Sequence, residues 1–126
     1  MVQKLEISGV HMTVGDELRK YVLRKIGKLD KYIPKHARES VHAEVKLEER
    51  NHRGKQERIC EVIIHMPKET IMLKETTINI YAAIDIVEEK LKLRLRKYKE
   101  LHDVPHLRQR LAARFRRQHH AAAEQL

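Results

Sequence analysis

The sequence predicts an α+β domain in which a four-stranded sheet carries two helices on one face. Three observations support this: four short segments favour strands, two longer segments have apolar residues at helical spacing, and their order is β-α-β-β-β-α. Alternating strands leave one apolar sheet face, which two amphipathic helices can cover. With 126 residues, the chain fits one domain. We assign residues 1–102 to it and residues 103–126 to a basic tail, partly helical or disordered.

Residues 2–8 form the first predicted strand, with Leu5 and Ile7 on one face and Lys4 and Glu6 on the other. Residues 16–33 form the first predicted helix, whose apolar stripe is Leu18, Val22, Ile26, Leu29 and Ile33. Pro34 ends that helix because proline cannot continue it. Its N-terminal cap is either Thr13, in a capping box, or Gly15.

Three further strands follow the first helix. Residues 40–48 alternate cleanly between apolar and polar side chains, as in a half-buried strand. Residues 57–66 form the next strand, with Cys60 on its apolar side as a buried, inert thiol. The polar residues 50–55 between them are predicted to be a hairpin loop. Residues 71–78 form the fourth strand.

Residues 81–101 form the second predicted helix, with a core stripe that consists of Ile84, Val87, Leu91, Leu95 and Tyr98. Basic residues follow both flanks of this stripe. One flank carries Lys90, Arg94 and Lys97, and the other carries Lys92, Arg96 and Lys99. Tyr81 and Asp85 lie four residues apart at the start of the helix. Either Tyr81 packs on the sheet and Asp85 favours the helix dipole, or Asp85 orients a neighbouring cation.

The net charge of +9 is concentrated near the C-terminus. Residues 1–89 hold 16 basic and 15 acidic residues, whereas residues 90–117 hold 11 basic and 2 acidic residues. Such a block indicates a polyanionic partner, either nucleic acid or an anionic membrane. The tail adds RNA contacts, orders only on its target, or forms a helix that binds a partner; the sequence leaves these open.

Other function classes find little support. No catalytic constellation or glycine-rich phosphate loop is visible, so we expect neither an enzyme nor a cofactor. His102 and His106 have ligand spacing but lack a third ligand, so no metal site is predicted, and His42 and His65 need no special role. A single cysteine, no membrane-spanning run and no signal peptide favour the cytoplasm.

Residues 3–100 resemble the hibernation-promoting factor and ribosome-associated inhibitor family, in its short single-domain form. The resemblance rests on Tyr81-Ala-Ala-Ile-Asp85, on the basic residues that follow it, and on Ser8-Gly9 and residues 18–32. It departs from the family pattern at Gly15, at Asn79 and at Leu93-Arg94, and the last departure affects one RNA contact.

This resemblance implies a fold similar to double-stranded RNA-binding domains and a protein that binds the small ribosomal subunit, and the whole ribosome, through ribosomal RNA. It implies occupation of the transfer-RNA and messenger-RNA channel and inhibition of translation, with no membrane or small-molecule partner. From the resemblance and the basic flanks together, the expected RNA-binding residues are Lys20, Arg24, Lys25, Lys28, Lys90, Arg94, Arg96, Lys97 and Lys99.

Two alternatives remain at this stage. One is a general double-stranded RNA-binding module, which would bind free duplexes as well as ribosomes. The other is a protein-interaction module that modulates a stress or transcription regulator through the open sheet face. The residues sensitive to substitution would then be Glu44, Lys46, Glu48, Ile59, Glu61 and Ile63.

Overall fold

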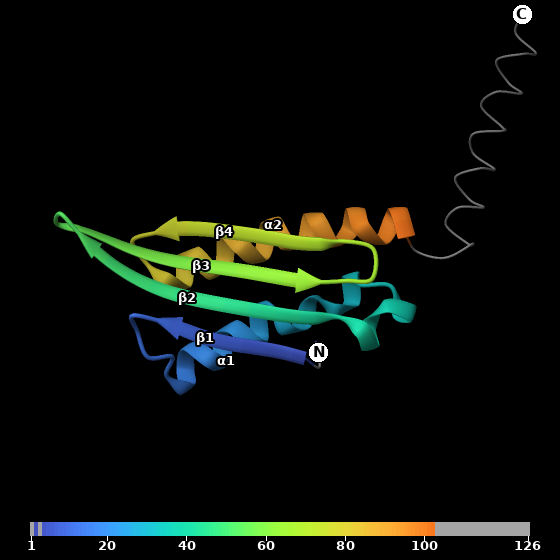
Figure 1. The fold of residues 1–126 in the computed structure, drawn as a ribbon, viewed down its shortest axis with the longest axis horizontal. Helices are drawn as coiled ribbons and strands as arrows, with labels where there is room; N and C mark the ends of the chain where they lie inside the picture. Colours follow the sequence, from blue (N-terminus) through green and yellow to red (C-terminus); the bar gives the residue numbers. More distant parts are fainter. Residues whose placement is uncertain (1, 3, 103–126) are drawn as a thin grey trace, which may run out of the picture.

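The computed structural model describes residue 2 and residues 4–102, and it confirms the predicted α+β fold. Two helices, α1 (Asp16–Lys25) and α2 (Ile80–His102), lie on one face of the sheet (Figure 1). The sheet has the order β1-β2-β3-β4, and its strands are β1 (Lys4–Val10), β2 (His42–His52), β3 (Lys55–His65) and β4 (Thr70–Thr77). The predictions made for residues 103–126 lie outside the described residues.

The sheet is mixed, because β1 pairs with β2 in parallel while the other neighbours are antiparallel. A parallel pair needs a long crossover connection, and α1 with the turns after it supplies that connection. The connection carries the chain across the inner face of the sheet, so α1 packs on the same side as α2 (Figure 1).

The β2–β3 hairpin is longer than the sequence predicted. The predicted loop at residues 50–55 is wrong, because the strands continue to His52 and Lys55 and leave a turn of only two residues. Arg53 and Gly54 have φ values of 51° and 77°, the positive values that a type I′ hairpin turn requires. The end of the hairpin projects beyond the helices, so its residues are polar on both faces and give no alternating signal (Figure 1).

The first helix is shorter than predicted, because α1 ends at Lys25 and a 3-10 helix, η1 (Gly27–Tyr32), continues the chain. The Gly27 carbonyl accepts a hydrogen bond of 2.9 Å from the Val2 N–H. This bond ties the N-terminal segment to the first turn of η1. A second 3-10 helix, η2 (Lys35–Ser40), follows Pro34. The apolar stripe is nevertheless buried, as predicted. Gly15 occupies the N-cap without a side-chain hydrogen bond, so the Thr13 alternative is wrong.

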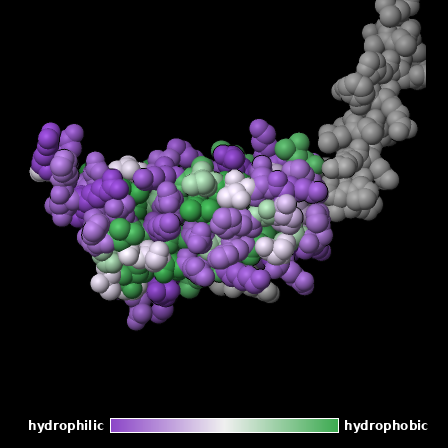
Figure 2. All heavy atoms as spheres, in the orientation of Figure 1, coloured by the Kyte–Doolittle hydropathy of each residue, from purple (hydrophilic) through white to green (hydrophobic). Residues whose placement is uncertain are grey.

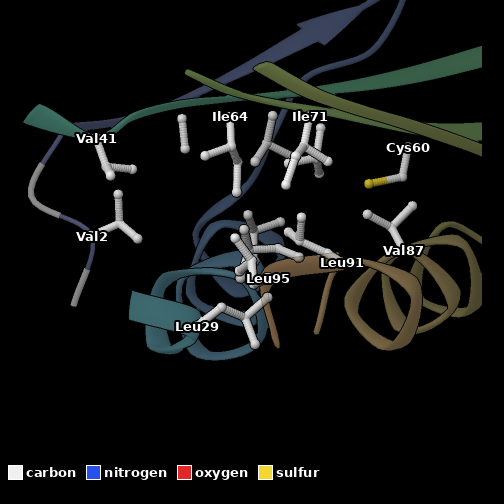
Figure 3. Packing of buried hydrophobic residues seen from close by; sticks show 14 of the residues in the cluster. Val2, Leu29, Val41, Cys60, Ile64, Ile71, Val87, Leu91 and Leu95 are labelled. Atoms are coloured by element: carbon white, nitrogen blue, oxygen red, sulfur yellow. The ribbon is translucent and has the colours of Figure 1, made fainter. Parts of the chain in front are cut away.

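The core lies between the inner face of the sheet and the helices (Figure 3). Ile64 and Ile71 of the sheet meet Leu91 and Leu95 of α2, and all four side chains are fully buried. Cys60 is also fully buried, and this burial raises the pKa of its thiol to about 12. Within the described part of the chain, every buried residue of the core is apolar.

Candidate nucleic-acid interface

The nine residues predicted to bind RNA all lie in the helical layer, on the side away from the open sheet face. Lys20, Arg24 and Lys25 belong to α1, and Lys28 belongs to η1. The remaining five lie on α2, around a stripe whose residues are buried in the core: Lys90, Arg94, Arg96, Lys97 and Lys99. The core stripes of the helices therefore fix the direction of these cations, because a buried face forces the opposite face outward.

The junction between α1 and α2 is built around Tyr21. Its hydroxyl donates a hydrogen bond of 2.5 Å to Asp85 Oδ1, and this bond raises the pKa of the Tyr21 phenol to about 12. The Tyr81 ring meets the Tyr21 ring edge-on, with centroids 4.9 Å apart. Tyr81 therefore packs on α1 and is partly exposed, so the expectation that it packs on the sheet is wrong.

Asp85 also holds a cation, in agreement with the second reading of the Tyr81–Asp85 pair. Lys25 Nζ lies 3.5 Å from Asp85 Oδ1 and 3.8 Å from Glu88 Oε1. Arg24 takes a different position, with its guanidinium carbon 5.2 Å from the centre of the Tyr21 ring. One tyrosine thus fixes the hydrogen-bonded carboxylate and the neighbouring arginine together.

The two basic flanks of α2 face different neighbours. Arg96 lies over the Tyr32 ring at 5.1 Å, so its flank faces η1. A hydrogen bond from Arg96 lowers the pKa of the Tyr32 phenol because the guanidinium favours the phenolate. On the other flank, Lys90 forms an ion pair with Glu75 of β4. Lys92, which the sequence prediction omitted, lies on the Tyr32 side and contacts Glu89 at 3.7 Å.

The nine predicted residues therefore fall into three groups. Lys25 and Lys90 are paired with carboxylates, and Arg24 and Arg96 are held over tyrosine rings. Among the residues that the structure describes, the other five have no acidic partner: Lys20, Lys28, Arg94, Lys97 and Lys99. The apolar spacing along the chain gives no sign that Tyr21 and Tyr32 hold arginines, because both contacts depend on where the rings lie in the folded protein.

The charge of α2 rises toward its C-terminal half. From residue 90 to residue 99 the helix carries six basic residues and no acidic one. Of these six, only Lys99 lies in the last turn, where the helix dipole favours a cation, so the dipole does not offset the repulsion among the other five. No helix within the described residues is long and apolar enough to cross a membrane.

The fold and this surface define an α+β protein with a rigid, basic helical face. The family model described as "Sigma 54 modulation protein / S30EA ribosomal protein" matches residues 5–102, and the chain belongs to that family. The match covers both helices and all but the first residue of the sheet. It therefore includes the whole basic surface as the structure describes it.

Two curated relatives are named ribosome hibernation promotion factor. The protein from Lactococcus lactis is 35% identical over 98 residues, and the one from Staphylococcus aureus is 34% identical over 96 residues. Each alignment covers 76% of this chain but only 49% and 48% of the respective relatives. The chain thus spans about half the length of the curated relatives it matches.

Two solved structures share the fold. The N-terminal domain of Protein Y from Thermus thermophilus superposes with a TM-score of 0.62 at 22% identity, covering 74% of this chain and 94% of that domain. A ribosomal subunit interface protein from Coxiella burnetii also gives a TM-score of 0.62, at 19% identity, covering 77% of this chain and 98% of that one. At these identities the similarity establishes the fold.

Proposed function

We propose that this protein is a ribosome hibernation factor that binds the small ribosomal subunit in the transfer-RNA and messenger-RNA channel and inhibits translation. It acts in the cytoplasm, as a binding protein without catalysis and without a small-molecule substrate. Family membership and the names of the two relatives support this proposal. The observation that carries it is the run of six basic residues on α2, unbroken by an acidic residue and adjacent to the cations of α1.

Ribosomal RNA suits this surface for a physical reason. Its phosphates form a dense and fixed array, and lysines on rigid helices neutralise several of them while releasing their counterions. A-form RNA is recognised mainly through its shape and backbone, which requires positioned charges more than base-reading groups. Both helices are anchored by the core, so their cations approach such an array without an ordering step.

The three groups of cations have different expected roles. The five without an acidic partner are free to meet phosphates directly. Arg24 and Arg96 are pre-positioned, because a guanidinium that stacks on a tyrosine keeps its edge available for phosphate oxygens. Lys25 and Lys90 must first exchange a carboxylate for a phosphate, so each contributes less to the net affinity.

The test is co-sedimentation with ribosomes and with separated subunits over a range of salt concentrations. The variant Arg94→Glu/Lys97→Glu/Lys99→Glu reverses three cations that have no acidic partner within the described residues, so it leaves the internal ion pairs intact. The matched control is Lys46→Glu/Lys55→Glu/Lys74→Glu, which makes the same change of net charge on the sheet and hairpin. Circular dichroism of both variants tests whether each is folded before their binding is compared.

The proposal expects the wild type and the control to sediment with the small subunit and the α2 variant to remain in the supernatant. Equal loss in both variants would indicate a nonspecific charge effect and would contradict the assignment to α2. A footprint of the bound protein on ribosomal RNA then tests the channel itself. Protection elsewhere on the subunit would overturn that part of the proposal.

The two alternatives predict different results in the same assay. A general double-stranded RNA-binding module would be displaced from ribosomes by an equal mass of free RNA duplex. A protein-interaction module acting through the outer sheet face would lose its binding in the control variant and keep it in the α2 variant.

A further inference from the structure

Two histidines and two glutamates converge on the outer face of the sheet, on the side away from the basic helices. Strand pairing brings them together: His42 of β2 lies opposite His65 of β3, and Glu44 of β2 lies opposite Glu6 of β1. His42 Nε2 lies 3.8 Å from Glu6 Oε1, and His65 Nε2 lies 3.4 Å from Glu44 Oε2. The two imidazole rings are 5.8 Å apart.

This arrangement places two like charges side by side. Glu6 and Glu44 are direct neighbours in the parallel β1–β2 pair, and two like charges this close repel each other. Lys4, opposite His42, and Lys46, two residues beyond Glu44, lie on the same face. Within the described residues, however, the only partners of the two carboxylates are the imidazoles. A positive charge between the carboxylates would remove the repulsion.

We propose that Glu6, His42, Glu44 and His65 form a binding site for a divalent transition metal ion, with zinc as the best match. Two imidazole nitrogens and two carboxylate oxygens are a donor set that zinc accepts. Zinc bonds of roughly 2.1 Å in a tetrahedron separate neighbouring donor atoms by about 3.4 Å. Glu6, His42 and Glu44 each have one donor atom within 4.8 Å of the other two. His65 adds a fourth donor, because its Nε2 lies 3.4 Å from Glu44 Oε2.

A hydrogen-bond partner orients one of the ligands. Thr70 Oγ1 lies 3.5 Å from His65 Nδ1, the ring nitrogen that faces away from the cluster. A proton on Nδ1 that points at this hydroxyl leaves Nε2 unprotonated and directed at Glu44. Metal-bound histidines in proteins commonly have a partner of this kind. Thr70 lies opposite His65 in the β3–β4 pair, so the sheet itself fixes this contact.

A metal ion at this position would connect three strands. Among the strands that the structure describes, β1 is an edge strand that pairs with β2 alone, and a bound ion would join it to β2 and β3 together. The side chains of the four ligands are between 33% and 73% exposed, so the ion enters from solvent without any movement of the backbone. The site lies on the other side of the sheet from the RNA-facing cations and is independent of the proposed function.

The experiment is a zinc titration of the full chain against a chromophoric chelator, at a fixed pH of about 7.5 because metal binding to histidine depends on pH. The site variants are His42→Gln and His65→Gln. Because the chain has nine histidines, two of them adjacent, the matched control is His119→Gln/His120→Gln. Nuclear magnetic resonance of the histidine rings in the zinc-bound protein identifies the rings that coordinate the ion.

The proposal expects one equivalent of zinc that both site variants lose and the control keeps, with ring shifts at His42 and His65 only. Thr70→Val should weaken this binding by about tenfold, since it removes the partner that orients His65. Zinc binding that is lost only in the tail variant, or equal in all the proteins, would overturn the site. A wild type that binds no zinc would overturn the site as well.

Discussion

The helical face and the outer sheet face of this protein are both rich in charge, but they arrange it differently. On the outer sheet face, Lys46 and Lys74 both lie opposite Glu61, so cations alternate with anions across the strands. Figure 2 shows this face, where hydrophilic side chains surround small hydrophobic groups. On α2 the cations from Lys90 to Lys99 have few acidic partners. A surface whose positive and negative charges alternate has a small net potential and attracts a polyanion weakly. A rigid helix with uncompensated positive charge attracts one strongly.

The largest effect is expected from a substitution in the hydrophobic core, which supports both the helical face and the outer sheet face. Leu91→Ala removes a fully buried side chain of α2 and should lower the free energy of unfolding by about 2–5 kcal/mol. Because one core supports the sheet and both helices, urea unfolding should remain a single transition by fluorescence and by circular dichroism. Separate transitions for helices and sheet would show that the faces are not coupled. The exposed Leu93→Ala is the control and should change stability little.

The second prediction compares the charge of the two faces directly. The Arg94/Lys97/Lys99→Glu variant should lower the salt dependence of RNA affinity, reducing the slope of log K against log salt by about three. The sheet-face control with Lys46, Lys55 and Lys74 reversed should keep the wild-type slope. Fluorescence anisotropy with an A-form duplex measures both slopes. Equal slopes in the two variants would mean that the faces contribute alike.

The third prediction concerns the tyrosines that hold the helical face. Tyr21→Phe removes the hydrogen bond to Asp85 and should cost about 1 kcal/mol of stability at neutral pH. The folded-state pKa of Tyr21 lies at about 12, above its ordinary value near 10. This contribution is therefore complete below about pH 10 and is lost as the pH rises toward 12, because the phenol then ionises.

Tyr32 serves as the internal comparison for this titration. Its pKa is lowered by the hydrogen bond from Arg96, so it should ionise before Tyr21. Ultraviolet titration of the wild type, Tyr21→Phe and Tyr32→Phe separates the two phenols. If Tyr32→Phe removed the phenol that ionises last, the assignment of the two environments would be wrong.

The smallest effect is expected on the outer sheet face. Glu6→Gln removes one of two neighbouring carboxylates and should raise stability by up to about 1 kcal/mol when no metal is present. The same substitution should reduce any gain in melting temperature that zinc gives to the wild type. Thermal unfolding with and without zinc measures both. A loss of stability without zinc would show that the carboxylates do not repel each other.

Much of the fold was predictable because its signals are local. The apolar stripe of α2 and the alternation in β2 lie within a few residues of chain, and both were correctly assigned to the core. The end of α1 was not predictable from periodicity, because the apolar stripe continues unchanged through the 3-10 helix that follows Lys25. The hairpin was underestimated because its projecting end has no buried face.

The assignment of individual RNA-binding residues remains a prediction, although the structure sorts them by their partners. Periodicity could place Lys25 and Lys90 outward, but it could not show that Asp85 and Glu75 hold them. It could not show Tyr32 beneath Arg96 either, since the two are separated by most of the chain.

The sequence by itself determined the apolar stripes of both helices, the inner face of β2 and the helix that carries the excess charge. These properties depend on spacing along the chain and on composition, which local steric and hydrophobic preferences convert directly into structure. Only the tertiary structure decided which cations are already paired and that Glu6, His42, Glu44 and His65 meet. Such contacts depend on strand register and helix packing, which are set by the whole core at once and leave no local mark in the sequence.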